Sequence, residues 1–217
     1  MELKSHCLIG ATGGPMADDR WWRGFDAVIL DAVGKGARVL DVGCGDGALV
    51  NCLLAHGLDV FGVDPRASIH PRLVQQRVED AETLGRFDAV CAIMSLHHAE
   101  LEPVLSAITR LLRPEGRLFA YELAWEAYDD RAATWLARHD PTDADNSIAA
   151  WELEHADLHT DATIHSALDS AFGLVSDHPR PYLARMLGIH DLEREEQALI
   201  DGEALPALGR CYVAHRR

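Results

Sequence analysis

The stretch VLDVGCGDGALV, residues 39–50, decides how this chain is interpreted. An apolar run is interrupted by Asp41, glycines crowd together, and apolar residues then resume. Glycine has no Cβ, so the backbone at Gly43 and Gly45 can lie directly against a ligand. The pattern predicts a buried strand, a ligand-binding turn and the start of a helix.

The composition indicates a soluble globular protein with a small-molecule partner. The chain has 217 residues, of which 48% are hydrophobic, and its formal net charge is −15. Such a surface repels the polyanionic backbone of nucleic acid. Residues 1–22 lack the pattern of a signal peptide, and no window approaches the ~20 apolar residues of a membrane span. We therefore expect a cytoplasmic protein, monomeric or homodimeric, that binds neither nucleic acid nor membranes.

Strand-like and helix-like segments alternate along the first 125 residues. The strand-like segments are RVLDVG, DVFGVD, RLVQQRV, RFDAVCAIM and RLFAYELA, and the helical ones include GALVNCLLAHG and LEPVLSAITRLLRPEG. Two further strand-like segments, LVSDHPRPYLA and RCYVAH, lie near the C-terminus. The alternation predicts an α/β fold with a doubly wound, parallel sheet that is covered on both faces.

The order of the expected helices and strands divides one expected domain, residues 1–217, into four parts. Residues 1–36 are expected to form N-terminal lid helices, and residues 37–125 the ligand-binding core. A helical, acidic insert over residues 126–171 is expected to cover the substrate. Residues 172–217 then supply the last strands.

The glycine turn and a later acid together predict a nucleoside pocket. Ligands of open α/β sheets lie beyond the carboxyl ends of the strands. Asp64 ends the second strand there, where its carboxylate can accept both hydroxyls of a ribose. Gly43-x-Gly45-x-x-Ala48 also satisfies the loose dinucleotide pattern. However, Asp41 puts negative charge near the ligand, which opposes a pyrophosphate and suits a cationic group.

The ordered motifs resemble those of class I S-adenosylmethionine-dependent methyltransferases, most closely the type 11 small-molecule group. The motifs are VLDVGCGDGALV, VFGVDP, VEDAETL, FDAVCAIMSLHH and LLRPEGRLFAYE, within residues 38–122. The resemblance implies a seven-stranded, Rossmann-like sheet whose last strand is antiparallel, with a helical lid. It also implies transfer of a methyl group from S-adenosylmethionine to an oxygen, nitrogen or carbon of a small molecule, releasing S-adenosylhomocysteine.

The resemblance implies roles for the residues of the glycine turn. Gly43, Cys44 and Gly45 would pass under the methionyl and ribose parts of S-adenosylmethionine. Asp41 would anchor the amino end, and Asp64 would accept the ribose hydroxyls.

It implies further roles at the ends of the next strands. Pro65 would lie beside the adenine. Asp80 would accept a hydrogen bond from the adenine amino group, and the backbone of Ala81 would donate to the ring. Ile93 and Met94 would border the methionyl part.

His97 and His98 are the candidate catalytic bases. Methyl transfer from a sulfonium needs mainly a well-held acceptor, and a base helps only when that acceptor carries a proton. Histidine titrates near neutral pH, and the pair follows the fourth strand. A simpler interpretation is that these histidines brace the next helix. Trp21 and Trp22 either close over the methionyl end or pack a helix on the sheet.

A metal site is not expected, although one helical stretch carries possible ligands. His155 and His159 are four residues apart, with Glu152 and His165 nearby. A metal needs three or four convergent ligands, so a solvated polar face is the simpler interpretation. Glu122 either contacts the ligand or is an ordinary acid at a strand end.

Three other functions stay open at this level. The first is a nicotinamide-dependent oxidoreductase, which Asp41 opposes. The second is a methyltransferase acting on protein or RNA. The acidic balance opposes RNA, and IMSLHH stands where an amide clamp of the Asn-Pro-Pro-Tyr type would follow the fourth strand. The third is a regulatory protein that binds the cofactor without methylating anything.

Overall fold

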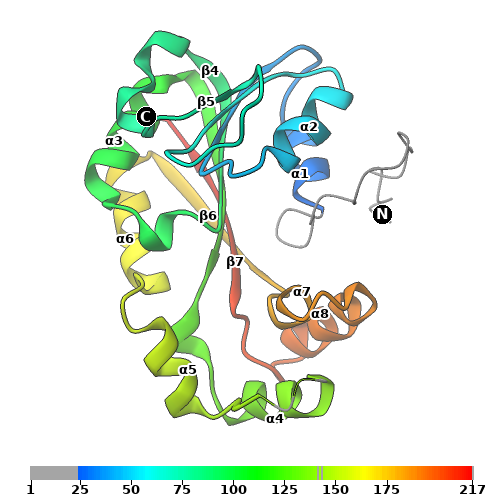
Figure 1. The fold of residues 1–217 in the computed structure, drawn as a ribbon. Coiled ribbons are helices and arrows are strands. Elements are labelled where there is room, and N and C mark those ends of the chain that lie inside the picture. The colour runs from blue at the N-terminus through cyan, green and yellow to red at the C-terminus, as the bar shows by residue number, and fades with distance from the viewer. Residues whose placement is uncertain (1–23, 141, 143, 217) are drawn as a thin grey trace.

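The computed structural model describes residues 24–140, 142 and 144–216 (Figure 1). Seven strands form one sheet in the order β3-β2-β1-β4-β5-β7-β6. Their bounds are β1 Arg38–Val42, β2 Asp59–Val63, β3 Leu73–Val74, β4 Phe87–Ile93, β5 Leu112–Leu123, β6 Leu174–Arg180 and β7 Gly209–His215. Strands β1 to β5 are parallel to one another, and β7 is antiparallel to both β5 and β6. The predicted seven-stranded, mainly parallel sheet with an antiparallel last strand is confirmed.

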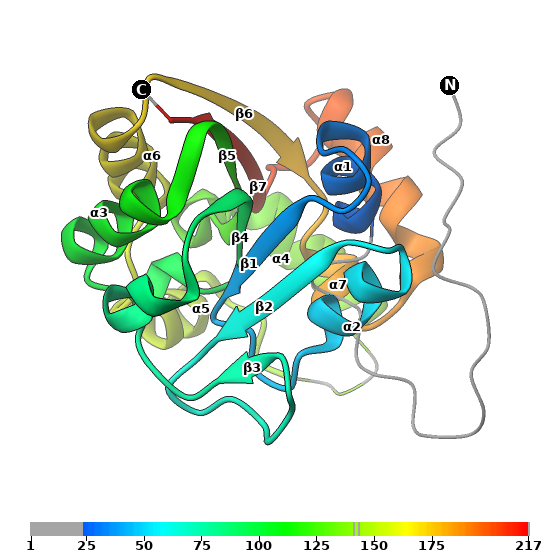
Figure 2. The ribbon, with the colours of Figure 1, turned by 90° about the horizontal axis from the view of Figure 1, so that it is seen from above.

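Helices cover both faces of this sheet, as Figure 2 shows from above. One face carries α1 (Phe25–Ala32), α2 (Ala48–Ala55), α7 (Leu183–Met186) and α8 (Glu193–Asp201), and the other carries α3 (Leu101–Leu111) and α6 (Asp161–Ala171). Helices α4 (Asp130–His139) and α5 (Ile148–His155) follow the end of β5 (Figure 1). Four 3-10 turns complete the described elements: η1 (Val78–Leu84), η2 (Leu96–His98), η3 (Trp125–Ala127) and η4 (His190–Leu192). None of the described helices is long and apolar enough to cross a membrane.

The two covered faces explain the unbroken apolar runs of the sequence. In β1, Val39 packs into the core beneath α1 and α2, whereas Leu40 packs into the core beneath α3 and α6. Both side chains are fully buried. Strands buried on both faces read as continuous hydrophobic segments, which is why β1 and β4 were predictable.

Strand β3 is much shorter than the predicted segment RLVQQRV. Only Leu73 and Val74 pair with β2. After Val74 the backbone N–H of Gln76 donates to the Val74 carbonyl at 3.0 Å, so the chain turns and leaves the sheet edge. A very short edge strand limits unwanted pairing with other chains.

The helices of the predicted lid take two different places. Helix α6 packs its buried Ile164 and Leu168 into the core under α3, so it covers the sheet. Helices α4 and α5 lie at the end of the sheet where the carboxyl ends of the parallel strands gather (Figure 1).

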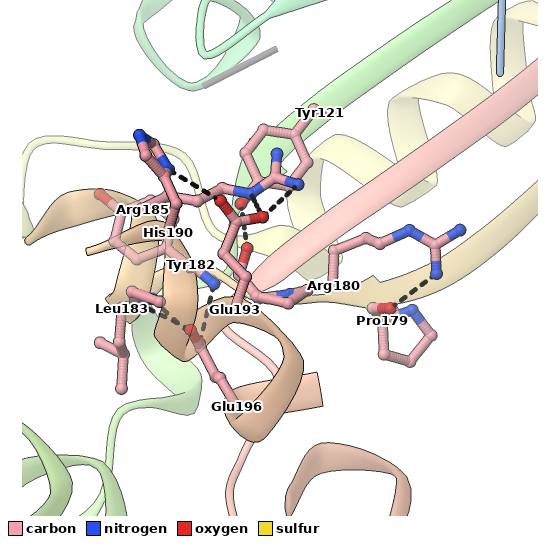
Figure 3. Close-up of polar contacts among 11 residues, drawn as sticks. Tyr121, Pro179, Arg180, Tyr182, Leu183, Arg185, His190, Glu193 and Glu196 are labelled. Carbon is pink, nitrogen blue, oxygen red and sulfur yellow. Dashed lines mark hydrogen bonds and ion pairs between the residues drawn. The ribbon is translucent and has the colours of Figure 1, made fainter. Parts of the chain in front are cut away.

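A polar network fixes α7 and α8 to the sheet (Figure 3). Glu196, fully buried, accepts hydrogen bonds from the backbone N–H groups of residues 182–184 at 2.8, 3.0 and 2.8 Å. Arg185 forms an ion pair with Glu193 at 3.2 Å, and its guanidinium lies 5.1 Å from the ring centre of Tyr121 in β5. A buried carboxylate that accepts three hydrogen bonds holds its donors in place, so α7 and α8 have a fixed position beside the sheet.

Candidate functional site

A cleft opens at the carboxyl ends of β1, β2 and β3, against the loop that follows β4. It combines the glycine turn with apolar walls and a few polar side chains. Its lining residues are Val42, Gly43, Val63, Pro65, Gln76, Arg77, Val78, Glu79, Ser95, Leu96, His98, Ala99, Glu100 and Val104. This is the position at which α/β sheets bind their ligands.

The glycine turn brings backbone against the loop after β4. Gly43 has φ +76°, and a Cβ there would lie 2.7 Å from the Cβ of Ser95. Its N–H donates to the Val63 carbonyl at 2.9 Å, which ties the turn to the end of β2. Both the backbone conformation and the contact with Ser95 therefore require glycine at position 43.

Asp64 joins the end of β2 to the same turn. One carboxylate oxygen accepts from the backbone N–H of Gly45 at 3.2 Å, and the other accepts from that of Arg66 at 2.6 Å. The structure thus places the predicted ribose acid beside the predicted glycine turn. Oxygen lone pairs that these two hydrogen bonds leave free can accept further hydrogen bonds.

Asp41 lies under the turn and is only 4% exposed. Burial, and then the nearby carboxylates of Asp64 and Asp46, raise its pKa to about 8. The side chain is therefore mainly protonated at neutral pH. A cation bound nearby would favour the ionised form, because opposite charges stabilise each other.

Cys44 is a packing residue rather than a nucleophile. Burial, and then the charge of Asp41, raise the pKa of its thiol to about 12. A reactive cysteine needs the thiolate, which these surroundings disfavour. Its side chain instead packs against β2, where a Cβ at Gly62 would lie 2.7 Å from the Cys44 sulfur.

Strain marks the end of β4. Met94 has φ +51°, in the left-handed region that side chains rarely occupy, and its N–H donates to the Tyr121 carbonyl at 2.7 Å. Ile93 and Met94 are both half-buried. Strained residues that are held by their surroundings cluster at functional sites.

Asp80 and Ala81, the predicted adenine-binding residues, directly follow Val78 and Glu79, which line the cleft, and their roles stay predictions. Asp80 is exposed, and Ala81 is fully buried in the core beneath α3. Neither lines the cleft, whereas Gln76 and Glu79 do.

His97 is held in place by a buried acid. Its Nδ1 lies 2.5 Å from Glu122, and the two side chains are 6% and 0% exposed. Glu122 also accepts from the backbone N–H groups of Ser95 at 3.1 Å and Leu96 at 2.8 Å. Glu122 therefore anchors the loop after β4 to β5, a role that the sequence alone left open.

His98 borders the cleft itself. Its ring centre lies 4.3 Å from that of His97. Partial burial, and then the neighbouring His97, lower the pKa of His98, which favours the uncharged ring. Its imidazole can accept a proton in that state.

The side chains of the other candidate histidines contact backbone carbonyls. His155 Nδ1 lies 2.8 Å from the Trp151 carbonyl, and its ring stacks on Trp151 with ring centres 4.1 Å apart. His159 Nε2 lies 2.9 Å from the Ala99 carbonyl, which ties the linker between α5 and α6 to the loop after β4. Trp21 and Trp22 lie outside the described residues.

Among the described residues, one group of three side chains brings metal-type ligand atoms within 4.8 Å of one another: Asp26, Cys52 and His56. The group lies on α1 and α2 and includes none of the histidines that the sequence singled out. Cys52 is disulfide-bonded, so its sulfur is not a thiolate ligand.

Known proteins share this arrangement to different extents. The ubiquinone biosynthesis O-methyltransferases of Xanthomonas oryzae pv. oryzae and Xylella fastidiosa strain 9a5c are 34% and 32% identical to this chain, over 135 and 133 residues respectively. Each alignment covers 46% of this chain, and 55% and 52% of the respective relatives. The chain thus matches only about half the length of these relatives.

Two solved structures share the fold. The 1,6-didemethyltoxoflavin-N1-methyltransferase of Burkholderia thailandensis, solved with S-adenosylhomocysteine, superposes with a TM-score of 0.56 at 18% identity, over 93% of this chain and 79% of that one. A TehB-like methyltransferase from Corynebacterium glutamicum gives 0.52 at 16% identity, over 89% and 88%.

The family is shown by a match that covers more than half of the chain and ends within β6. Residues 22–175 match the family model described as a methyltransferase domain. The match includes the glycine turn, Asp64 and the loop after β4, which are the parts that form the cleft. The chain therefore belongs to the methyltransferase domain family.

Proposed function

We propose that this protein transfers the methyl group of S-adenosylmethionine to an oxygen, nitrogen or carbon atom of a small molecule. The observation that carries the proposal is the close approach of Gly43 to Ser95 in the cleft, with Asp64 hydrogen-bonded to the same glycine turn. The names of the relatives support it, because they are methyltransferases and one structure was solved with S-adenosylhomocysteine. The names of the curated relatives favour oxygen as the acceptor atom, whereas that of the Burkholderia thailandensis structure favours nitrogen.

The cleft fits the parts of this cofactor. Asp64 is placed to accept hydroxyl hydrogens of a ribose, next to the open backbone of the turn. Pro65 and Leu96 offer apolar walls to a planar base. Asp41 lies where a cationic amino or sulfonium group would be stabilised by its ionised form. Buried polar atoms without a partner, such as Ser95 Oγ, also fit a site that a ligand completes.

Methyl transfer from an activated donor requires the protein mainly to position the acceptor atom. S-adenosylmethionine supplies an activated methyl group when bound. The chain holds the acceptor atom in line with the leaving sulfur and excludes water, which is where most of the rate comes from. The rigid loop after β4, fixed by Glu122 from one side and by His159 from the other, is the positioning device that we propose.

His97 and His98 are the proposed proton acceptors for a substrate that arrives protonated. Glu122 fixes one ring nitrogen of His97, as an orienting carboxylate does in catalytic triads. The lowered pKa of His98 favours its uncharged form, and the residue borders the cleft. A substrate that already carries a free lone pair would need neither histidine.

The remaining proposals concern the setting of the reaction. We propose a small-molecule acceptor, because the relatives of known name act in small-molecule pathways. The strongly acidic chain supports a cytoplasmic enzyme, monomeric or homodimeric, that does not bind nucleic acid.

Calorimetric titration with S-adenosylhomocysteine tests the proposal. The wild type should bind it, and Asp64→Ala should weaken binding by about tenfold or more, which corresponds to about 1.4 kcal/mol. Asp31→Ala is the matched control, because Asp31 is an exposed acid on α1. Absence of binding by the wild type would reject the proposed function. Binding without methylation of any acceptor in a broad screen would indicate a regulatory protein instead.

A further inference from the structure

Three side chains of metal-ligand type meet where α1 and α2 pack against each other on one face of the sheet (Figure 2). Asp26 belongs to the first turn of α1, Cys52 to α2, and His56 is the residue that ends α2. A carboxylate oxygen, the sulfur and a ring nitrogen all lie within 4.8 Å of one another. None of the three residues lines the cleft, so this group is a separate place on the molecule.

The carboxylate of Asp26 is the sign that this group takes a ligand. Asp26 is only 4% exposed, and its carboxylate forms no hydrogen bond or ion pair with another described residue. Burying a charge is costly unless it is paired or coordinates a metal ion. A cation held between the three side chains would supply the missing partner.

The chemistry of the three side chains selects zinc among the common divalent cations. Thiolate, imidazole and carboxylate are the three protein ligand types of Zn²⁺, with bonds of about 2.0–2.3 Å. Cys52 and His56 are four residues apart, so both lie on the same side of α2. His56 is exposed, so its ring can rotate to shorten the ligand separations. Three protein ligands leave the fourth tetrahedral position to water.

The oxidation state of Cys52 decides whether the set is complete. Cys52 is disulfide-bonded in the structure, and a disulfide sulfur lacks the negative charge of a thiolate ligand. A dithiol reductant gives up two electrons and two protons as its own sulfurs form a disulfide. Cys52 and its former partner are thereby released as thiols. Zinc binding then displaces the proton of the Cys52 thiol to solvent.

We propose that Asp26, Cys52 and His56 form a zinc site that is available only after the disulfide of Cys52 is reduced. In that state the metal ion would join α1 to α2. Thiols of the cytosol are kept reduced, so the proposed cytoplasmic setting supplies the reduced form. The inference does not rest on the proposed function, because none of the three residues belongs to the cleft.

Calorimetric titration with zinc chloride tests the inference on two forms of the full chain. One form is kept oxidised, and the other is reduced with a phosphine. Thiol titration under denaturing conditions should find two more thiols in the reduced form. We expect the reduced wild type to bind one zinc ion per chain, and the oxidised form to bind it at least about tenfold more weakly.

Single substitutions identify the ligands. Asp26→Asn, Cys52→Ser and His56→Ala should each weaken zinc binding to the reduced protein by at least about tenfold. Cobalt chloride gives a second measurement, because a thiolate bound to Co²⁺ produces a charge-transfer absorption band. That band should appear in the reduced wild type and be absent from Cys52→Ser.

Matched controls come from the same residue types elsewhere. Asp31 is an exposed acid on α1, and His165 is a half-buried histidine on α6. Asp31→Asn and His165→Ala should bind zinc as the wild type does. Cys44, Cys91 and Cys211 are thiols in both forms, so they cannot explain a difference between the forms. Melting curves and titration with S-adenosylhomocysteine check that each variant is folded.

The outcomes separate this inference from the proposed function. It is overturned if the reduced wild type binds no stoichiometric zinc, or if the oxidised form binds zinc equally well. It is also overturned if the control variants lose as much affinity as the ligand variants, which would indicate binding to the acidic surface in general. Failure to bind S-adenosylhomocysteine would reject the proposed function and leave the zinc site intact.

Discussion

At the scale of single residues, Asp41 links folding to pH. Its pKa is about 8 in the folded protein and 3.8 in an unfolded chain, because burial disfavours the charged form. A raised pKa contributes stability that is complete below pH 3.8 and is lost as the pH rises through about 8. The unliganded protein should therefore lose stability across this window.

Asp41→Asn should remove that loss, because asparagine resembles the protonated acid in size and carries no charge. We expect the variant to be more stable than the wild type at pH 8 by about 1–3 kcal/mol, with a smaller difference at pH 5. Urea denaturation at both pH values measures this. An equal difference at the two pH values would show that the effect does not come from ionisation.

Substitutions at Gly43 and Gly57 separate the cost of a strained backbone conformation from the cost of a steric contact. Both have φ near +80°, at +76° and +82°, but only a Cβ at Gly43 meets another atom, the Cβ of Ser95 at 2.7 Å. Gly57→Ala should cost only the backbone strain, about 1–2 kcal/mol. Gly43→Ala should cost more and also weaken S-adenosylhomocysteine binding.

Denaturation and calorimetry on the two variants decide between these contributions. Gly57 closes α2 away from the cleft, so its variant should bind the ligand as the wild type does. Equal stability losses and equal binding in the two variants would mean that the contact between Gly43 and Ser95 does not matter.

At the scale of elements, Glu122 joins β5 to the loop after β4. Replacing it with alanine leaves the Ser95 and Leu96 N–H groups and His97 Nδ1 without their acceptor. We expect Glu122→Ala to destabilise the fold by about 3 kcal/mol, and Glu122→Gln by less because it keeps one accepting oxygen. Urea denaturation tests this against Glu102→Ala, an exposed acid on α3. A loss no larger than that of the control would contradict the anchoring role.

The elements also show what the sequence can predict. Strands β1, β2, β4 and β5 were predictable because their apolar runs follow from burial on both faces. The length of β3 was not predictable, because the length of an edge strand depends on its pairing with the neighbouring strand rather than on its own apolar pattern. The bracing of His97 by Glu122 joins residues on different strands, so only the fold reveals it.

At the scale of the whole molecule, the net charge of −15 should favour a cationic ligand. S-adenosylmethionine carries a sulfonium charge that S-adenosylhomocysteine lacks, so the two ligands form a matched pair of nearly equal shape. The carboxylates of Asp46 and Asp64 lie close to the turn and add to the field there. We expect affinity for S-adenosylmethionine to fall by about two- to fivefold between about 20 and 200 mM salt, because salt screens such fields.

The product supplies the internal control for this experiment. S-adenosylhomocysteine has no net charge, so its affinity should change little over the same range of salt. Calorimetry on both ligands in one set of buffers measures the two dependences directly. If both affinities fall equally, salt acts on the protein rather than on the ligand's charge. If neither changes, the cleft is screened from the acidic surface, and the preference for a cation must come from Asp41 and its immediate neighbours.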